Sequence, residues 1–350
     1  MNRAATLALL PFSSLYWAGV KARLALYQTG ALRTHNLGAP VISVGNMTAG
    51  GTGKTPLVEW IARHLASEGH RTCILTRGYG RANPRERVVV SDGKTILADP
   101  EQAGDEPLLL AERLAGQAAV ISDRDRVGAA HWAIENLTSE VFILDDGFQS
   151  LRVARNLNIV TIDAANPWSN GRLLPAGLLR EPRSGLARAD CIVITRASDS
   201  QSTQPLQREI DRFSKGRTVF LSHMKNSGIR PLSKTGEPSF KLGTPDSVPV
   251  AAFCAVGSPQ SFFSQLCKDG YSLAYTQAFR DHHRYAQRDI DALVKRSIAS
   301  GARALLTTAK DEVKLRSLRL GLPCYAIDIA IEIDDDEKLR RMIDKSIRQT

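Results

Sequence analysis

A glycine-rich loop between an apolar strand and a helical pattern constrains the fold of this chain more than any other feature. The apolar stretch Val41–Val44 leads into Gly50-Gly51-Thr52-Gly53-Lys54-Thr55, and a helical pattern begins at Pro56. Glycines let backbone N–H groups turn toward phosphates, a lysine adds positive charge, and a threonine hydroxyl can hold Mg²⁺. A glycine-rich turn without a ligand is the alternative, but this order of strand, loop, Lys-Thr pair and helix favours a nucleotide-binding P-loop.

The loop departs from the usual P-loop pattern at one position. The pattern G-x-x-x-x-G-K-[ST] requires glycine where this chain has Thr48. The doubled Gly50-Gly51 resembles the loop of partitioning-type ATPases, but those proteins carry lysine where this chain has Ala49. We predict that the whole loop binds the nucleotide, with contacts from Thr48, Ala49, Gly50, Gly51, Thr52, Gly53, Lys54 and Thr55.

A second predicted strand ends in acidic residues. The apolar run Val141–Leu144 is followed by Asp145 and Asp146. An apolar strand that ends in aspartate is the Walker B arrangement, which puts a carboxylate beside the P-loop to hold Mg²⁺. The two motifs together predict a Mg²⁺ site that includes Thr55 and Asp146.

Apolar runs of strand length alternate with helical patterns through most of the 350 residues. This alternation predicts an α/β fold with a mostly parallel sheet of the P-loop NTPase type, helices on both faces, and a second, smaller α/β domain. The polar segment 197–205 predicts a linker, and the stretch 226–249, rich in glycine and proline, predicts a surface loop or hairpin. The predicted division is 1–30 as an N-terminal membrane-associating helix, 31–197 as the P-loop domain, which the C-terminal helix 335–350 can complete, and 198–334 as the smaller domain.

The individual elements follow from the same patterns. The predicted strands are Val41–Val44, Cys73–Thr76, Ala119–Ser122, Val141–Leu144, Leu157–Ile162, Cys191–Thr195, Thr218–Ser222, Val250–Ala255 and Ala304–Thr307. The predicted helices between them include Pro56–Ser67, Glu106–Leu114, Arg126–Asn136 and Arg288–Ser300.

Composition narrows the class of partner. The net charge of +10 predicts a surface that attracts anions, such as nucleic acid, nucleotide phosphates or anionic lipid headgroups. Aromatic residues make up only 6% and no basic run is interleaved with them, which argues against a nucleic-acid stacking platform. The five cysteines form no C-x-x-C pair, which indicates a reducing cytosol and neither disulfides nor structural zinc.

The N-terminal segment is apolar and then basic. Residues 4–20 carry no charge and include Leu15 and Trp17, and Lys21 and Arg23 follow them. The stretch is slightly short for a membrane-spanning helix, which needs about 20 apolar residues. An interfacial helix fits better, with aromatic and leucine side chains at the lipid boundary and basic side chains at the headgroups. A helix packed on the domain core is the alternative.

Three polar clusters are not explained by core packing. Asp105, within Gly104–Pro107, starts a predicted helix and is either an N-cap or a base that accepts a proton from an acceptor hydroxyl. In Asp281-His282-His283 the neighbouring imidazoles point apart, so they make a poor metal pair, but one of them can assist a carboxylate base or meet a phosphate. Lys310 and Asp311 follow a strand end and resemble the base-recognition loops of some P-loop proteins.

The motifs in combination resemble one family, the tetraacyldisaccharide 4'-kinases, which are the lipid A kinases of Gram-negative bacteria. The motifs that carry the resemblance, in family order, are Gly50-Gly51-Thr52-Gly53-Lys54-Thr55-Pro56, Arg77-Gly78-Tyr79-Gly80, Gly104-Asp105-Glu106-Pro107, Asp145-Asp146-Gly147-Phe148-Gln149, Leu174-Pro175-Ala176-Gly177, Arg180-Glu181-Pro182 and Asp281-His282-His283. The resemblance implies two α/β domains joined by a short hinge with the nucleotide between them. It implies transfer of the ATP γ-phosphate to the 4'-hydroxyl of a tetraacylated glucosamine disaccharide 1-phosphate, with Mg²⁺, on the cytoplasmic face of the inner membrane. No obligate protein partner and no nucleic acid are implied.

The resemblance also implies roles for individual residues. The predicted catalytic residues are Lys54, Asp146, and the proton-accepting pair Asp105 and His282. Thr55, Asp146 and Glu181 are predicted at the metal. The remaining predicted contacts are Lys310 and Asp311 for the nucleotide, and Arg77, Tyr79, Asp145, Gln149 and Arg180 for the acceptor.

Two other classes of protein compete with this hypothesis. The first is a membrane-associated ATPase switch of the partitioning or metallochaperone type, in which Asp105 and His282 would have no task. The second is a basic nucleic-acid binder, which the P-loop disfavours. A switch hydrolyses ATP with protein partners alone, whereas a lipid kinase needs its acceptor.

Overall fold

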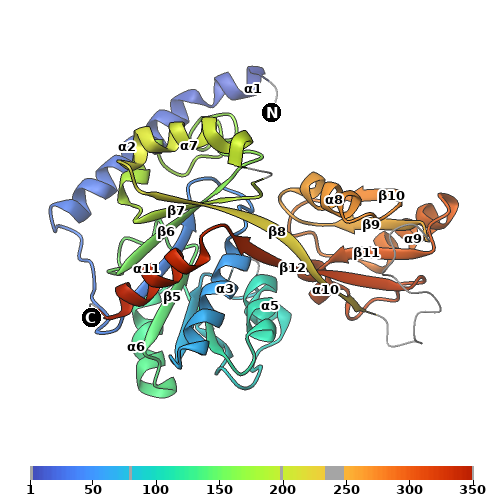
Figure 1. Ribbon diagram of the computed structural model, residues 1–350, viewed down its shortest axis with the longest axis horizontal. Coiled ribbons are helices and arrows are strands. Elements are labelled where there is room, and N and C mark those ends of the chain that lie inside the picture. Colours follow the sequence, from blue (N-terminus) through green and yellow to red (C-terminus); the bar gives the residue numbers. More distant parts are fainter. Residues whose placement is uncertain (1–2, 79–80, 198–199, 233–247, 349–350) are drawn as a thin grey trace.

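The computed structural model describes residues 3–78, 81–197, 200–232 and 248–348. It confirms the predicted α/β fold, with one mixed, mostly parallel sheet of twelve strands that runs through two lobes (Figure 1). The strand order is β10-β9-β11-β12-β8-β7-β6-β1-β5-β2-β4-β3. Within the described residues, no helix is both long enough and apolar enough to pass through a membrane.

The first lobe is built around the P-loop strand. Its strands are β1 (Val41–Asn46), β2 (Thr72–Thr76), β3 (Val88–Ser91), β4 (Ala118–Ser122), β5 (Val141–Asp145), β6 (Leu157–Asp163) and β7 (Cys191–Thr195). Its helices are α3 (Lys54–Ser67), α4 (Pro100–Ala103), α5 (Asp105–Arg113), α6 (Arg126–Leu137), α7 (Ser200–Ser214) and the 3₁₀ helix η1 (Arg183–Arg188). All neighbouring pairs among these strands are parallel except β3 with β4.

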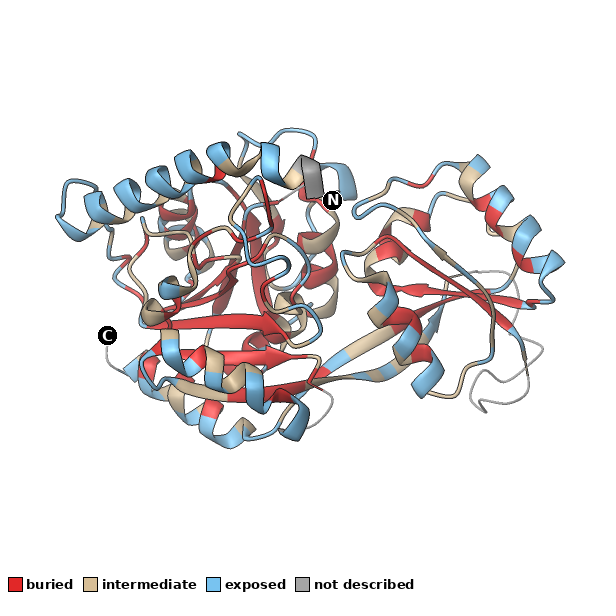
Figure 2. Ribbon diagram, turned by 90° about the horizontal axis from the view of Figure 1, so that it is seen from above, coloured by how far each residue is buried: buried red, intermediate tan, exposed pale blue. Residues whose placement is uncertain are grey.

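Helices cover both faces of this part of the sheet. Alternate side chains of a strand point to opposite faces, so Ile42 and Val44 of β1 join the apolar cluster of α3 and α5. Val41 joins the opposite cluster, which contains Val127 and Ala130 of α6. Strands buried on both faces need continuous apolar sequence, which is why these runs could be recognised. The strands appear as buried ribbons in Figure 2.

The second lobe repeats the α/β design on a smaller scale. Its strands are β9 (Val250–Cys254), β10 (Leu273–Ala278) and β11 (Ala304–Thr308), and its helices are α8 (Pro259–Lys268), α9 (Gln287–Ala299) and α10 (Ala309–Leu315). Two long strands, β8 (Thr218–Pro231) and β12 (Cys324–Ile333), pair antiparallel and connect the lobes. Figure 1 shows this ribbon passing from one lobe to the other.

The first two helices and the last helix all lie on the first lobe (Figure 1). Helix α11 (Asp336–Arg348) buries Leu339 and Ile343 in the same cluster as Ile42 of β1. At the other end, α1 (Arg3–Ala8) and α2 (Leu10–Gln28) lie along the outside of the lobe, and α2 is largely exposed (Figure 2).

Several sequence-based expectations need correction. The segment expected to be a linker is helical from Ser200, and α7 packs its Ile210 against Leu186 of η1 in the first lobe. The sequence 218–222 is only the start of the long strand β8, and the region expected to be a loop or hairpin begins with the rest of that strand. Most of the expected loop, 233–247, lies outside the described residues. Strands β3, β10 and β12 were missed, because β3 is only four residues long and the other two are only partly buried and include polar residues. We propose that the lobes divide within β8 and β12 rather than at residue 197.

Candidate active site

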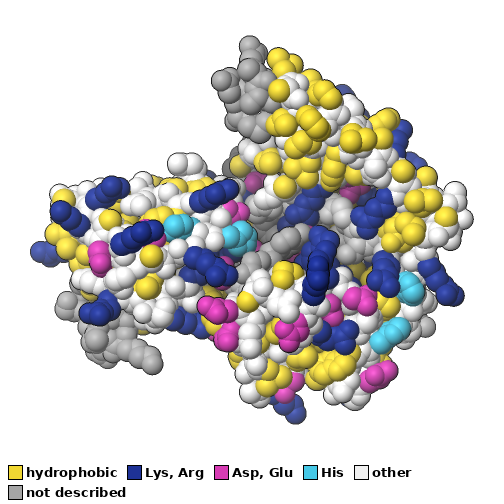
Figure 3. All heavy atoms as spheres, turned by 180° about the vertical axis from the view of Figure 1, so that it is seen from behind, with side chains coloured by type: hydrophobic (Ala, Val, Ile, Leu, Met, Phe, Trp, Pro, Cys, Tyr) yellow, Lys and Arg dark blue, Asp and Glu magenta, His cyan; other side chains and the backbone are white. Residues whose placement is uncertain are grey.

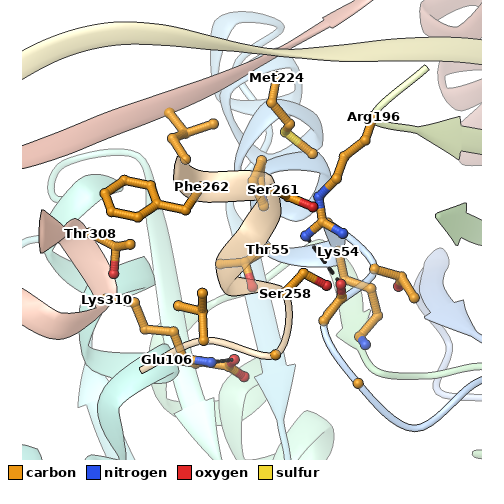
Figure 4. Close-up of a pocket in the computed structure, with 18 of the residues that line it drawn as sticks. Lys54, Thr55, Glu106, Arg196, Met224, Ser258, Ser261, Phe262, Thr308 and Lys310 are labelled. Atoms are coloured by element: carbon orange, nitrogen blue, oxygen red, sulfur yellow. Dashed lines mark hydrogen bonds and ion pairs between the residues drawn. The ribbon is translucent and has the colours of Figure 1, made fainter. Parts of the chain in front are cut away.

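A cavity of about 790 Å³ lies between the lobes and contains the sequence motifs. From the first lobe it is lined by Gly50–Pro56 and by Asp145 and Asp146. From the second lobe it is lined by residues that include His282 and Lys310. Figure 4 shows side chains of both lobes facing one another across this space. The structure thus brings together motifs that are far apart in the sequence.

The P-loop is tied to the strands behind it. Thr52 Oγ1 lies 2.7 Å from Thr161 Oγ1, and Thr195 Oγ1 donates to the Thr52 carbonyl at 2.8 Å. Gly53 has a φ of 76°, a left-handed backbone conformation that favours glycine. Helix α3 begins at Lys54, so its N-terminal N–H groups and dipole face the cavity, where they favour an anion.

Thr48 and Ala49, the two residues before the glycines, contact the protein and not the cavity. Thr48 is buried and pairs by a backbone bridge with Leu179, and the Ala49 N–H donates to the Leu178 carbonyl at 2.7 Å. Neither residue lines the cavity. In this structure Thr48 and Ala49 hold the start of the loop. Of the residues predicted to contact the nucleotide in this loop, those at 50–55 line the cavity.

Asp146 is the centre of the charged cluster. Its carboxylate lies 3.5 Å from Lys54 Nζ and accepts from Arg180 Nη1 at 2.7 and 2.8 Å. Burial raises the pKa of Asp146, but Lys54 and Arg180 outweigh this and lower it below its ordinary value. Asp146 is therefore ionised at neutral pH, as a ligand for a hard cation must be.

Asp145 has the opposite electrostatic environment. It is buried, and burial together with the nearby Glu106 raises the pKa of Asp145 to about 6. Thr55, Asp145 and Asp146 all line the cavity, and their hydroxyl and carboxylate oxygens are the donors that Mg²⁺ prefers. The donor set of this chain therefore fits Mg²⁺.

Glu181, which was predicted at the metal, is directed elsewhere. It is 2% exposed, accepts from Gln149 Nε2 at 2.8 Å, and forms an ion pair with Arg188. In the described part of the chain, no three His, Cys, Asp or Glu side chains gather as a ready-made metal site. In this structure Glu181 supports Gln149, which in turn contacts the Asn46 carbonyl and Arg180.

Asp105 and Glu106, at the start of α5, face different partners. Glu106 lines the cavity and its carboxylate lies 2.5 Å from Lys310 Nζ (Figure 4). Burial raises the pKa of Glu106, but Lys310 more than compensates and lowers it. Asp105 does not line the cavity and lies 3.4 Å from Lys314 Nζ. The sequence analysis did not single out Glu106, although it is the next residue after Asp105.

The two histidines are clearly distinguished. His282 lines the cavity, with a φ of 58°, and its N–H contacts the Ala255 carbonyl. His283 instead stacks on Phe279, with ring centroids 5.0 Å apart, and its Nε2 lies 3.0 Å from Asp289. Of the two, only His282 is placed to meet a ligand in this cavity.

The remaining predicted residues divide between the cavity and its surroundings. Arg77 and Arg180 line the cavity. Tyr79 lies outside the described residues. Asp311 is fully buried and accepts from the Ala255 N–H at 2.9 Å and from Thr308 Oγ1 at 2.8 Å. Its oxygens therefore bond within the second lobe in this structure, and Asp311 does not line the cavity, so its contact with the nucleotide stays a prediction.

Some lining residues had no signal in the sequence analysis. Arg196 directly follows β7 and donates to the Gly51 carbonyl at 3.2 Å. Its place at the carboxyl end of a parallel strand is a signal that could have found it. Gly257 approaches the P-loop so closely that a Cβ would lie 3.1 Å from the Gly51 N atom. Ser258 and Ser261, before and within the first turn of α8, also line the cavity (Figure 4), and such small residues offer no pattern to recognise.

Comparison with known proteins decides the family. The chain matches the family described as tetraacyldisaccharide-1-P 4'-kinase over residues 5–348. It belongs to this family. A tetraacyldisaccharide 4'-kinase of Desulfotalea psychrophila is 41% identical over 90% of this chain and 90% of its own length. A relative of the same name from Geobacter metallireducens is 40% identical over 97% of this chain and 98% of its own.

A solved structure supports the same assignment. It is described as the "apo" form of LpxK from Aquifex aeolicus in complex with ATP. It is 32% identical, with a TM-score of 0.76, and the match covers 98% of this chain and 99% of that one. The predictions of the family, of an ATP-dependent kinase and of the α/β fold are confirmed, and the ATPase-switch alternative is not supported.

Proposed function

We propose that this chain transfers the γ-phosphate of ATP to the 4'-hydroxyl of a tetraacylated glucosamine disaccharide 1-phosphate at a membrane surface. The observation that carries the proposal is the cavity, which joins a P-loop, an ionised aspartate and two basic side chains on one lobe to a histidine on the other. Phosphoryl transfer needs positioning, positive charge and a group that takes the hydroxyl proton, and this set supplies each of them.

The first lobe has the groups for the phosphates. The backbone of 50–55, the N-terminus of α3 and Lys54 bind the β- and γ-phosphates, and Arg180 adds charge beside them. Thr55 and Asp146 would hold Mg²⁺, with Asp145 next to them. A bound Mg²⁺ neutralises charge on the phosphate oxygens. Because Lys54 and Arg180 already pair with Asp146, these residues are oriented toward the same point.

Two carboxylates at the start of α5, Asp105 and Glu106, are the candidates to take the acceptor proton together with His282. Glu106 is tied to Lys310 by a close ion pair that lowers its pKa, which makes it a poor proton acceptor. Asp105 has only the longer contact with Lys314. We therefore keep Asp105 and His282 as the proton-accepting pair and assign to Glu106 the positioning of Lys310.

The exposed face of α1 and α2 is suited to a membrane surface. Leu7, Phe12, Leu15 and Trp17 are exposed by 59%, 60%, 73% and 41%. Figure 3 shows hydrophobic side chains gathered over the upper part of the molecule, where Figure 1 places these helices. Lys21 lies 4.4 Å from the centre of the Trp17 ring, so a cation lies at the edge of the apolar face. Such a helix binds anionic lipid in the interface, here on the cytoplasmic face of the inner membrane.

The test is transfer of labelled γ-phosphate to a defined acceptor. The purified full chain is mixed with Mg²⁺, labelled ATP and vesicles that contain the tetraacylated disaccharide 1-phosphate. The expected product carries the label at the 4' position, and an acceptor with a methylated 4'-hydroxyl remains unlabelled. The proposed function would be ruled out if the blocked acceptor became labelled, or if no lipid became labelled.

A further inference from the structure

One face of helix α2 contacts the first lobe through polar side chains, whereas most of the helix is exposed. Ser13 is 7% exposed and is the buried residue of this helix, whereas its neighbour Phe12 is 60% exposed. Ser13 Oγ donates to the Leu173 carbonyl at 3.0 Å and accepts from the Ala176 N–H at 3.0 Å. One hydroxyl thus closes two hydrogen bonds with the segment 172–181, which we call the 172–181 loop.

Tyr16 makes the next contact one helical turn further along. Its hydroxyl donates to the Arg180 carbonyl at 2.8 Å. Burial raises the pKa of Tyr16, so the phenol keeps its proton at neutral pH and acts as the donor. Residues three apart on a helix share a face, and Ser13 and Tyr16 therefore hold both ends of the loop.

The 172–181 loop is bonded in turn to the phosphate site. The Arg180 N–H donates to the Met47 carbonyl at 2.7 Å, and the Leu178 carbonyl accepts from the Ala49 N–H at 2.7 Å. The Arg180 side chain then reaches Asp146 at 2.7 Å. A continuous series of hydrogen bonds therefore runs from α2 through the loop to the Walker B carboxylate.

We propose that Ser13 and Tyr16 are positioning residues for phosphoryl transfer, because they hold the loop that sets Arg180 against Asp146. Neither residue lines the cavity, so they act through Arg180 and not on the substrate. Small displacements of a charged group from its productive position lower transfer rates strongly. The inference rests on the proposed function, since it concerns the same transfer step. It also means that the helix with the lipid-facing side chains is connected to the catalytic centre through the 172–181 loop.

Matched variants test the proposal. Tyr16→Phe and Ser13→Ala each remove one hydroxyl, and Tyr27→Phe and Ser14→Ala remove the same group elsewhere on α2. The first pair should lower kcat on the vesicle-bound acceptor by about tenfold, with little change in ATP KM. The control pair should stay within about twofold of wild type. Co-sedimentation with vesicles should be unchanged in all four, because the apolar face is intact. Equal kcat in the test and control pairs would overturn the proposal.

A second measurement separates positioning from a general loss of stability. In an Arg180→Ala background the loop no longer has a side chain to position, so Tyr16→Phe should lower kcat by less than about twofold. A destabilised protein would lose activity by the same factor in both backgrounds, and that result would overturn the inference. Failure of the proposed function itself is distinguishable, because wild type would then label no acceptor.

Discussion

The two lobes supply the cavity with residues in different ways. In the first lobe, Asp146 directly follows β5, and Lys54 begins α3 after the P-loop that follows β1. The two side chains lie 3.5 Å apart, next to the ends of two paired parallel strands. In the second lobe, His282 and Lys310 come from a loop after β10 and from the start of α10. The first set is placed by strand ends and the P-loop. In the second set His282 comes from a loop, and Lys310, two residues after β11, is also held by an ion pair with Glu106 of α5. The comparison suggests that the first lobe stabilises transferring charge and that the second lobe completes the site for the acceptor.

The largest effect is expected at the first-lobe charge. Lys54→Ala removes one of the two cations beside Asp146 and should lower kcat by a factor on the order of hundreds, as for other groups that stabilise developing charge. Lys225→Ala, an exposed lysine on β8, is the control and should be near wild type. Labelled-phosphate transfer measures both. Near-normal turnover of the Lys54 variant would contradict the claim that the first lobe stabilises the transferring charge.

The next largest effect is expected at the proton-accepting pair, Asp105 of the first lobe and His282 of the second. Asp105→Ala and His282→Ala should each lower kcat by tens to about a hundredfold, with less effect on ATP KM. The double variant should be little worse than the more damaged single variant, since groups that act together are non-additive. His283→Ala should be mild, because its ring stacks on Phe279 and does not line the cavity.

Glu106→Gln provides the sharpest check of this pair. The substitution keeps the shape of the side chain and removes its charge. A larger loss for Glu106→Gln than for Asp105→Ala, accompanied by a shift in the pH–rate profile, would mean that Glu106 is the proton acceptor. Fully additive losses for Asp105→Ala and His282→Ala would mean that the two residues act independently.

The fold and most of the first-lobe site could be predicted from the sequence because both depend on short-range patterns. Continuous apolar runs encode buried parallel strands, and the residues at the ends of these runs lie at one edge of the sheet. The long β8–β12 ribbon could not be predicted, because it is half-exposed and pairs residues about a hundred positions apart, such as Lys225 and Ala330. The turn of Asp311 into the core and the pairing of Glu106 with Lys310 depend on tertiary contacts that no local pattern encodes.

The stability of the protein as a function of pH tests whether the carboxyl of Asp145 is buried in the first lobe. Because the folded-state pKa of Asp145 is raised to about 6, its contribution to stability falls as pH rises from about 4 to 6. Asp145→Asn should therefore be more stable than wild type by about 2 kcal/mol at pH 7. Near pH 4, where the folded wild-type carboxyl is protonated, this difference should largely disappear. Urea unfolding without Mg²⁺ or nucleotide measures the free energy of unfolding of both proteins. A difference between them that does not change with pH would contradict the raised pKa of Asp145.

The smallest effect is expected at the contact between the lobes. Lys310→Ala removes the partner of Glu106 and should raise the ATP KM by about tenfold or less, while kcat changes little. Lys295→Ala, on the exposed side of α9, is the matched control. Steady-state kinetics at saturating acceptor separates the two constants. A loss in kcat as large as that of Lys54→Ala would mean that the second lobe also stabilises the transferring charge.

The most direct test of the account is the coupling between ATP consumption and lipid phosphorylation. ADP and phosphorylated lipid are counted in the same reaction, with vesicles that contain or lack the tetraacylated disaccharide 1-phosphate. The account predicts one phosphorylated lipid for each ADP and almost no ADP formation from vesicles without the acceptor. ADP formation at the same rate without the acceptor would contradict the account and indicate an ATPase that is not a lipid kinase.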